Sequence, residues 1–436
     1  MAPAQLSVIF FAQLFAIVAV SRLVGWLAKR FLGQPQVVGE MIAGVLLGPS
    51  LFGLLAPELQ AIVFPKEARG TLYAIAQLGV GLYMFIVGLG FRADHFRSSA
   101  RSATAVSLSG MAAPFLVAVA ITPWLMSVPG LFGDRVTHTQ ATLFMGACIA
   151  ITAFPMLARI IHERGLSDTP LGTLSLSAGA IDDAGAWTVL AVVLAAFGDG
   201  AGVAVKAIGG AILFAIVVLG FGPRLLRPLA ARAERTGEVG HAELGIALML
   251  FLLAAFAMDA VGMHAVFGGF LLGVVMPRGR FAEALRRQIE PVTVVLLLPC
   301  FFTFSGLNTQ LALVADPALL GIAVVVLLAS VAAKGIACWA AARLTGQDNA
   351  TAMGVGALMN ARGLMELIII NIGLARGIIG PALFSMLVVM AIVTTLMASP
   401  LFELVYGRRA RARGDLGHLS EEPDALEHRL NDAAAR

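Results

Sequence analysis

The stretch Leu171–Phe197 reads LGTLSLSAGAIDDAGAWTVLAVVLAAF and holds two adjacent aspartates, Asp182 and Asp183, within an otherwise apolar run. The run is long enough to cross a bilayer, which takes about 20 mostly apolar residues in a helix. A charged side chain at the bilayer centre costs roughly 2.5–3.5 kcal/mol on insertion scales, so two carboxylates at that depth are expensive. Membrane helices carry such residues for ion paths, proton relays or buried ion pairs. The stretch therefore predicts an ion-handling membrane protein.

The composition of the whole chain also indicates a polytopic, all-α membrane protein. Of its 436 residues, 59% are hydrophobic and only 13% are charged, and the mean hydropathy is +0.90. A soluble domain carries about a quarter charged residues. Cys148, Cys300 and Cys338 lie far apart within apolar runs, which favours packing roles over a disulfide or a metal site. We expect no cofactor, because no glycine-rich phosphate loop follows a strand pattern.

Hydropathy divides the chain into thirteen candidate membrane spans with soft boundaries. They lie near 6–28, 37–54, 71–91, 102–127, 138–162, 170–197, 203–223, 241–261, 263–276, 291–308, 317–344, 350–374 and 380–407. The first span has no basic residue before it, so we expect a retained helix and not a signal peptide. The region 241–276 could instead form one long kinked helix, which would change the count.

The basic residues supply an independent check on the count. Connections after odd-numbered spans hold 20 Lys or Arg residues, and those after even-numbered spans hold five. The five are Lys66, Arg69, Arg135, Lys206 and Arg376. Cytoplasmic loops are enriched in Lys and Arg, so the asymmetry predicts an outer N-terminus and a cytoplasmic C-terminus in the cell membrane. The polar tail 408–436 has too few apolar residues to form a core, and we expect it to be largely disordered.

The fifth and twelfth spans carry signs of interruption. In the fifth, HTQATLFMGACIAITAFPMLARII, Pro155 removes a backbone donor and Thr152 can bond the freed carbonyls. The twelfth, GVGALMNARGLMELIIINIG, places four notable residues at membrane depth: Asn360, Arg362, Gly363 and Glu366. Pro155 could merely kink its helix, and the i,i+4 pair in the twelfth span could merely neutralise itself. However, the fifth and twelfth spans are seven helices apart, so they cross the membrane in opposite directions. Two interrupted helices at matching positions of two inverted repeats indicate a transport site near the middle of the membrane.

Lys334 lies about halfway across the eleventh span, VVVLLASVAAKGIACWAAARL. A lysine at that depth must find an acid, lose its charge or extend to an interface. If the same offset of seven helices relates the two repeats, the eleventh span corresponds to the fourth. The eleventh span also directly precedes the interrupted twelfth span. Asp182 or Asp183 is then the natural partner of Lys334, with extension to the interface as the alternative.

The run ITAFPMLARIIHERGLSDTPLGTLSLSAGAIDDAGAW resembles the core of the monovalent cation:proton antiporter superfamily. The resemblance is closest to the branch with plant cation/proton exchangers and bacterial potassium-efflux and sodium/proton antiporters. Supporting matches are GQPQVVGEMIAGVLLGPS, MHAVFGGFLLGVVMP, LLPCFFTFSGLNT and MNARGLMELIIINIG, which occur in the family's order between residues 33 and 373.

The resemblance implies a thirteen-helix homodimer with inverted repeats and two crossed discontinuous helices. It implies one membrane transporter domain over 1–407, with a core domain roughly from 71–197 and part of 291–407. The remaining helices would form the dimerisation domain. The cytoplasmic nucleotide-binding domain of the potassium-efflux members has no counterpart in the tail, which disfavours ligand-gated efflux.

By position, Asp183 would bind the ion and the proton, and Asp182 would pair with Lys334 and share the metal ion, Na⁺ or K⁺. Thr152 would line the crossing opposite Arg362 and Glu366. Plant exchangers in this branch typically have asparagine before the essential aspartate, whereas this chain has Asp182, as in electrogenic sodium/proton antiporters. That departure leaves the cation and the stoichiometry open.

The combined expectation is a secondary active antiporter that exchanges Na⁺ or K⁺ for protons by alternating access and is not an enzyme. Its partners would be cations, protons, the lipid bilayer and a second copy, but no nucleic acid. A sodium-coupled symporter of an organic anion is the alternative. An aspartyl protease is disfavoured, because adjacent aspartates point about 100° apart on a helix. A receptor would need a larger soluble output domain than the tail offers.

Overall fold

The computed structural model of the chain describes residues 3–34, 36–90, 96–163, 166, 169–197, 201–236 and 239–407. Within these residues the regular structure is helical, apart from one isolated bridge between Phe132 and Ile379. The predicted all-α class is confirmed. The expectation of a disordered tail concerns residues 408–436, which lie outside the described residues.

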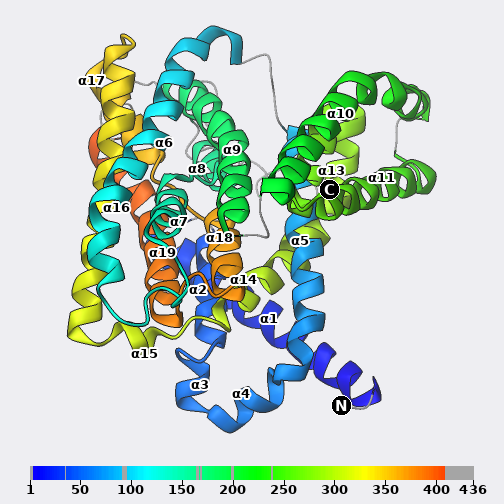
Figure 1. Cartoon of the computed structure of the whole chain (residues 1–436). Helices are drawn as coiled ribbons and strands as arrows, with labels where there is room; N and C mark the ends of the chain where they lie inside the picture. The colour runs from blue at the N-terminus through cyan, green and yellow to red at the C-terminus, as the bar shows by residue number, and fades with distance from the viewer. Residues whose placement is uncertain are drawn as a thin grey trace, which may run out of the picture.

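The longer helices follow the apolar runs of the sequence. They are α1 (Pro3–Leu32), α2 (Gln36–Leu47), α5 (Arg69–Gly90), α6 (Phe96–Met126), α7 (His138–Ala150), α8 (Phe154–Glu163), α9 (Pro170–Phe197), α10 (Ala201–Thr236), α11 (His241–Val261), α12 (Ala265–Val275), α13 (Arg280–Val292), α14 (Leu298–Gly306), α16 (Pro317–Leu344), α17 (Asn349–Leu358), α18 (Leu364–Ala375) and α19 (Pro381–Phe402). The short helices α3 (Phe52–Leu55), α4 (Pro57–Val63) and α15 (Leu311–Val314) lie at the same end of the molecule as the start of α1 (Figure 1).

Each predicted span coincides with one helix or with a pair of consecutive helices. Among the described residues, nine helical stretches are long and apolar enough to cross a membrane, and Ala265–Val275 and Glu366–Ala375 are shorter apolar helices. The chain is therefore a multi-pass membrane protein, while the count of thirteen crossings stays a prediction. The alternative of one kinked helix over 241–276 is wrong, because α11 ends at Val261 and α12 begins only at Ala265. The residue that follows α11, Gly262, has a φ of 91°, which suits glycine.

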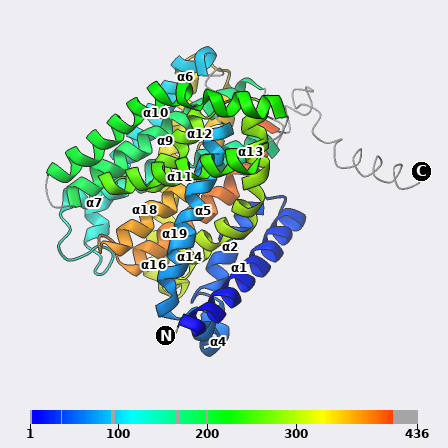
Figure 2. The ribbon, with the colours of Figure 1, turned by 90° about the vertical axis from the view of Figure 1, so that its right-hand side faces the viewer.

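The helices pack in two groups joined by α10. Helices α6 to α9 pack with α16 to α19, whereas α1, α2, α5 and α11 to α14 pack on one another. Figure 1 shows the first group on the left and the second on the right and below, and Figure 2 shows α1, α2, α5 and α14 close together. Helix α10 contacts α9 on one side and α11 and α12 on the other.

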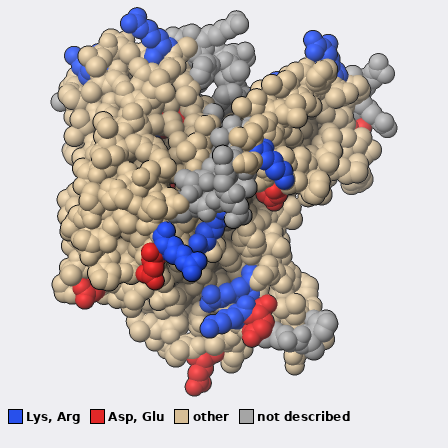
Figure 3. Space-filling model, in the orientation of Figure 1, with Lys and Arg blue, Asp and Glu red and all other residues tan. Residues whose placement is uncertain are grey.

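The surface separates charged ends from apolar flanks. Large apolar side chains are exposed along several helices, among them Phe15 of α1, Phe221 of α10 and Phe256 of α11. Figure 3 shows charged side chains at the top of the view and again in its centre and lower part, with a wide uncharged area on the left flank. A belt of this kind suits contact with lipid tails.

Glycines allow the backbones of α2 and α14 to touch. A Cβ atom on Gly44 would lie 2.3 Å from the carbonyl oxygen of Phe302, and one on Gly306 would lie 2.0 Å from the carbonyl oxygen of Gly44. Both distances are far shorter than a van der Waals contact. The atoms concerned belong to the backbone, so they cannot rotate away as a side chain could. Small residues at such crossings are a general device for packing helices in membranes.

We therefore expect Gly44→Ala to lower the free energy of unfolding by about 1–3 kcal/mol, the usual cost of overpacking. The matched control is Gly321→Ala in α16, where an added Cβ meets no atom within 4 Å. Thermal unfolding of the purified variants in detergent measures the difference. Equal melting temperatures for the two variants would contradict the close α2–α14 contact.

Candidate functional site

Two helices are interrupted, and their interruptions cross. Helix α7 ends at Ala150 and α8 begins at Phe154, while α17 ends at Leu358 and α18 begins at Leu364. The backbone N–H of Ala153 donates to the carbonyl of Ala361 at 3.0 Å, which joins the two extended segments. The crossed discontinuous helices predicted for the fifth and twelfth spans are confirmed.

Pro155 and Gly363 lie where the helices restart. Pro155 falls in the first turn of α8, where its missing N–H needs no partner, so it does more than kink a continuous helix. Gly363 directly precedes α18, and a Cβ there would lie 2.8 Å from the Cγ of Met156. Glycine thus permits the two interruptions to approach closely.

The end of α7 is held by two buried cations. Arg362 donates to the carbonyl oxygens of Cys148 at 2.6 Å and Ile149 at 2.8 Å, and Lys334 donates to that of Ala150. Carbonyls at a helix C-terminus have no partner within the helix and carry partial negative charge. In an apolar environment such groups must be satisfied, and here the two cations satisfy them.

Arg362 also ties α7 to three other helices. Its guanidinium donates to the Ser330 hydroxyl of α16 and lies 3.3 Å from Glu366 Oε1, in the first turn of α18. Its own carbonyl accepts from Thr395 Oγ1 of α19 at 2.8 Å. The i,i+4 pair with Glu366 is therefore present, but self-neutralisation does not describe it, because the same side chain holds the end of α7.

Asp182 is a buried carboxylate whose two oxygens are both satisfied. Lys334 Nζ lies 2.9 Å from Asp182 Oδ2, and Thr152 Oγ1 lies 2.7 Å from the same oxygen. Ser107 Oγ donates to Asp182 Oδ1 at 2.5 Å. Lys334 is completely buried, so the alternative of a lysine extending to an interface is wrong. The hydroxyl of Thr152 also lies 3.1 Å from the carbonyl oxygen of Met359, a second acceptor for its single proton.

Asp183 differs sharply from its neighbour. Its side chain is fully buried, and neither carboxylate oxygen has a hydrogen-bond partner of normal geometry among the described residues. The backbone N–H of Phe154, at the start of α8, is close enough to act on it electrostatically. Because a helix N-terminus carries partial positive charge, α8 favours an anion at this position. A buried polar group without partners needs an explanation in a native structure.

Asn360 lies inside the second interruption and is almost fully buried. Its Nδ2 donates to the carbonyl of Gly356 at 2.9 Å, while its Oδ1 has no hydrogen-bond partner among the described residues. A Cβ on Gly335 of α16 would lie 2.9 Å from Asn360 Nδ2, so the amide packs against that helix. The structure thus places Asn360 at the crossing, between α17 and α16.

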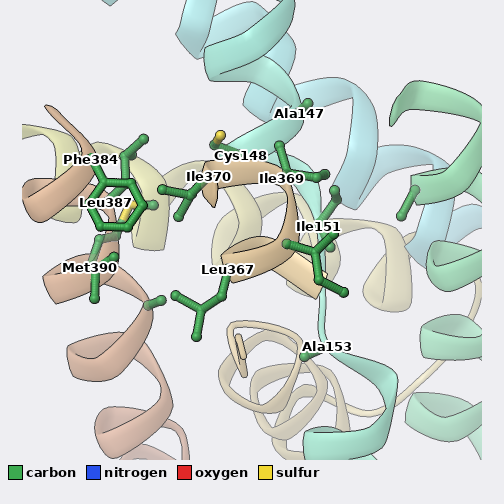
Figure 4. Packing of buried hydrophobic residues seen from close by; sticks show 14 of the residues in the cluster. Ala147, Cys148, Ile151, Ala153, Leu367, Ile369, Ile370, Phe384, Leu387 and Met390 are labelled. Atoms are coloured by element: carbon green, nitrogen blue, oxygen red, sulfur yellow. The ribbon is translucent and has the colours of Figure 1, made fainter. Parts of the chain in front are cut away.

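Apolar side chains surround the crossing. Figure 4 shows Cys148 and Ile151, at the end of α7, packed with Leu367 and Ile370 of α18, and Phe384 of α19 lies beside them. All of these side chains are buried. Electrostatic interactions are stronger in such surroundings than in water, so an uncompensated charge at the crossing is costly.

Sequence reasoning missed Ser107 and Ser330. Ser330 lies four residues before Lys334 on α16, and that spacing places both on one helix face, which was an available signal. Ser107 is one of several small polar residues in α6, and nothing in the sequence distinguishes it from Ser109. Only the packing of α6 against α7, α9 and α16 does so.

We expect Arg362→Gln to destabilise the protein by about 3–5 kcal/mol, because it leaves Glu366 as an uncompensated buried charge. The double variant Arg362→Gln/Glu366→Gln should recover part of that loss, since it removes the orphaned carboxylate. Arg287→Gln is the control, because its pair with Glu283 on α13 is exposed and contributes at most about 1 kcal/mol. Thermal unfolding in detergent tests this, and no recovery in the double variant would contradict it.

Comparison with known proteins identifies the family. The profile of the sodium/hydrogen exchanger transmembrane family matches residues 17–405. The Na⁺/H⁺ antiporter NhaS4 of Synechocystis sp. is 35% identical over 400 residues, which cover 91% of this chain and 96% of NhaS4. Cation/H⁺ antiporter 19 of Arabidopsis thaliana is 34% identical over 400 residues, covering 90% of this chain but only 49% of that longer relative.

The fold has a solved counterpart. The structure of the sodium proton antiporter MjNhaP1 from Methanocaldococcus jannaschii matches with a TM-score of 0.63 at 14% identity, over 92% of this chain and 96% of that one. The sequence-based resemblance is thus confirmed by profile, relatives and fold together. The chain belongs to the transmembrane sodium/hydrogen exchanger family.

Proposed function

We propose that the protein is a secondary active antiporter that exchanges a monovalent cation, Na⁺ or K⁺, for protons by alternating access. The observation that carries the proposal is the buried Asp183 carboxylate, which has no hydrogen-bond partner of normal geometry among the described residues, beside the fully satisfied Asp182. The similarity to proteins named Na⁺/H⁺ and cation/H⁺ antiporters supports it. It gives no support to the symporter alternative. We accordingly propose a transporter and not an enzyme.

The charges at the crossing favour a monovalent ligand. Among the described residues there, Asp182, Asp183 and Glu366 are acidic, while Lys334 and Arg362 are basic. With all five charged, one negative charge is left over, and it belongs to Asp183. One proton or one monovalent cation compensates it, whereas a divalent cation would overcompensate. An uncompensated charge in a buried site is strongly destabilising, so Asp183 must exchange one ligand for the other.

Competition between proton and cation then takes place at one carboxylate. An alkali cation that has lost water needs hard oxygen ligands, and Asp183, Asp182 and Thr152 offer three side chains with such oxygens. Backbone carbonyls freed at the interruptions can add others. A proton on Asp183 removes its charge and its capacity as a ligand. Proton and cation therefore exclude each other, which is the requirement for antiport.

We propose that α6 to α9 and α16 to α19 form the moving core, with α1, α2, α5 and α11 to α14 as the scaffold and dimerisation domain. The sequence-based division had α5 in the core, and we now propose it for the scaffold, because it packs on α12 and α14. Helix α14, from the range 291–407 that was assigned only in part, joins it because it packs on α2 and α5. Polar contacts between the groups, such as Asn371 Nδ2 to Ser305 Oγ at 3.1 Å, would break during the movement. The core moves only when Asp183 is occupied, because moving an uncompensated carboxylate within the apolar part of the membrane is costly.

We further propose that the protein is a homodimer in the cell (inner) membrane, with its N-terminus outside and its C-terminus in the cytoplasm. The family resemblance supports the dimer. The 20 basic residues after odd-numbered spans, against five after even-numbered ones, support the orientation.

Asp183→Asn should abolish exchange, since an amide neither titrates nor carries the charge that attracts a cation. Asp134→Asn, at an exposed position in the loop before α7, is the matched control and should exchange normally. Proteoliposomes with an imposed pH gradient and separate additions of Na⁺, K⁺ and Li⁺ measure exchange and selectivity together. Cation-dependent pH change in the Asp183→Asn variant would refute the assignment, and a gradient that collapses only with an organic solute would favour symport.

Lys334 should decide how many protons move per cation. We propose that a cation reaching Asp182 displaces the Lys334 ammonium, which then gives up its proton to water. Together with the proton that leaves Asp183, two protons exchange for one cation. The cation-loaded site is then one charge more negative than the proton-loaded site, so net charge moves. Lys334→Gln keeps a donor for the Ala150 carbonyl but has no proton to release. Its exchange should lose the response to an imposed voltage that the parent shows. A response equal to that of the parent would contradict this role.

A further inference from the structure

Helix α6 contributes directly to the ion pair between Asp182 and Lys334. It packs along α7, α9 and α16. Asp182 lies on α9, Lys334 lies on α16, and Thr152 lies in the interruption that follows α7. Ser107 of α6 is completely buried and donates to Asp182 Oδ1 at 2.5 Å. Thr152 and Lys334 both contact the other oxygen, Oδ2. Among the described residues, Ser107 is therefore the hydrogen-bond donor to Oδ1.

The next turn of α6 contacts the cationic end of the same pair. The carbonyl of Gly110 accepts from Lys334 Nζ at 3.4 Å. A Cβ on Gly110 would lie 2.6 Å from Cys338 Sγ and 4.0 Å from Lys334 Nζ, so only glycine lets α6 come this close to α16. One stretch of α6 thus supplies a donor to the carboxylate and an acceptor to the ammonium.

We propose that Ser107 is a positioning residue that makes the Asp182–Lys334 pair breakable by an incoming cation. This inference rests on the proposed antiport. With Ser107 in place, Oδ1 is satisfied independently of Lys334, and Oδ2 is the oxygen that can change partner. Without the Ser107 hydroxyl, Asp182 Oδ1 would be buried without a hydrogen-bond donor. The negative charge of Asp182 would then be compensated to a greater extent by Lys334. A cation would then have to break a tighter pair.

The expected signature is a change in cation affinity that depends on Lys334. Removing a hydrogen bond to a buried charged group has an effect large enough for about a tenfold change in affinity. Ser107→Ala should raise the half-saturating cation concentration about tenfold while changing the maximal exchange rate less than about twofold. In the Lys334→Gln background the same substitution should change cation affinity less than about twofold, because no ion pair remains to tighten. Residues that act through one another show this non-additivity.

The experiment compares four variants in proteoliposomes and by calorimetric titration of the purified protein with NaCl and with KCl. The variants are Ser107→Ala, Ser109→Ala, Lys334→Gln and Ser107→Ala/Lys334→Gln. Ser109, half-buried on another face of α6, is the matched control and should behave as the parent does. If Ser107→Ala fails to fold, Ser107→Cys, which is nearly isosteric and a weak donor, should give a smaller rise in the same direction.

The inference is overturned if Ser107→Ala keeps the parental affinity, or if it weakens binding equally with and without Lys334. A loss of maximal rate at unchanged affinity would also overturn it, since that would indicate a merely structural role. Failure of the antiport proposal is distinguishable, because the parent protein itself would then show no cation-dependent proton movement.

Discussion

The structure depends on one constraint, which is that two interrupted helices leave backbone dipoles ending in an apolar environment. The carbonyls that end α7 face two buried cations, Arg362 and Lys334. The restarting helices, α8 and α18, have the carboxylates of Asp183 and Glu366 near their N-termini. Cations thus lie at negative helix ends and acids at positive ones, the favourable arrangement for a helix dipole. The charges are expensive individually, and together they satisfy the backbone groups that the interruptions leave unpaired.

This arrangement explains why two adjacent aspartates can have different roles. Asp182 receives Ser107, Thr152 and Lys334, which fixes its orientation and compensates its charge. Asp183, one residue further along α9, points about 100° away and receives none of them. Neighbouring positions on one helix therefore give one carboxylate that is held in an ion pair and one that awaits a ligand. In the proposed mechanism Asp183 alternates between proton and cation, and the Asp182–Lys334 pair opens when the cation arrives.

Much of this could be predicted from the sequence, because charges within apolar runs are conspicuous. Asp182, Lys334, Arg362 and Glu366 stand out for that reason. The opposite directions of the fifth and twelfth spans, seven helices apart, also predict that the two interrupted helices belong together. The sequence left open whether Lys334 pairs with Asp182 or with Asp183, because the answer depends on which face α9 turns toward α16. Ser107 and Thr395 could not be found, because small hydroxyl residues are common in membrane helices and only tertiary packing selects among them. The binding of α7 carbonyls by Arg362 was equally hidden, since the sequence does not show which backbone groups an interruption leaves unpaired.

The central claim is that a proton and a metal ion compete for the carboxylate of Asp183. The most direct measurement adds NaCl or KCl to the purified protein in weakly buffered detergent solution and records the protons released. We expect proton release that saturates with cation concentration, diminishes as the starting pH is raised, and is absent in Asp183→Asn. Cation binding detected as heat, with no proton release at any starting pH, would contradict it.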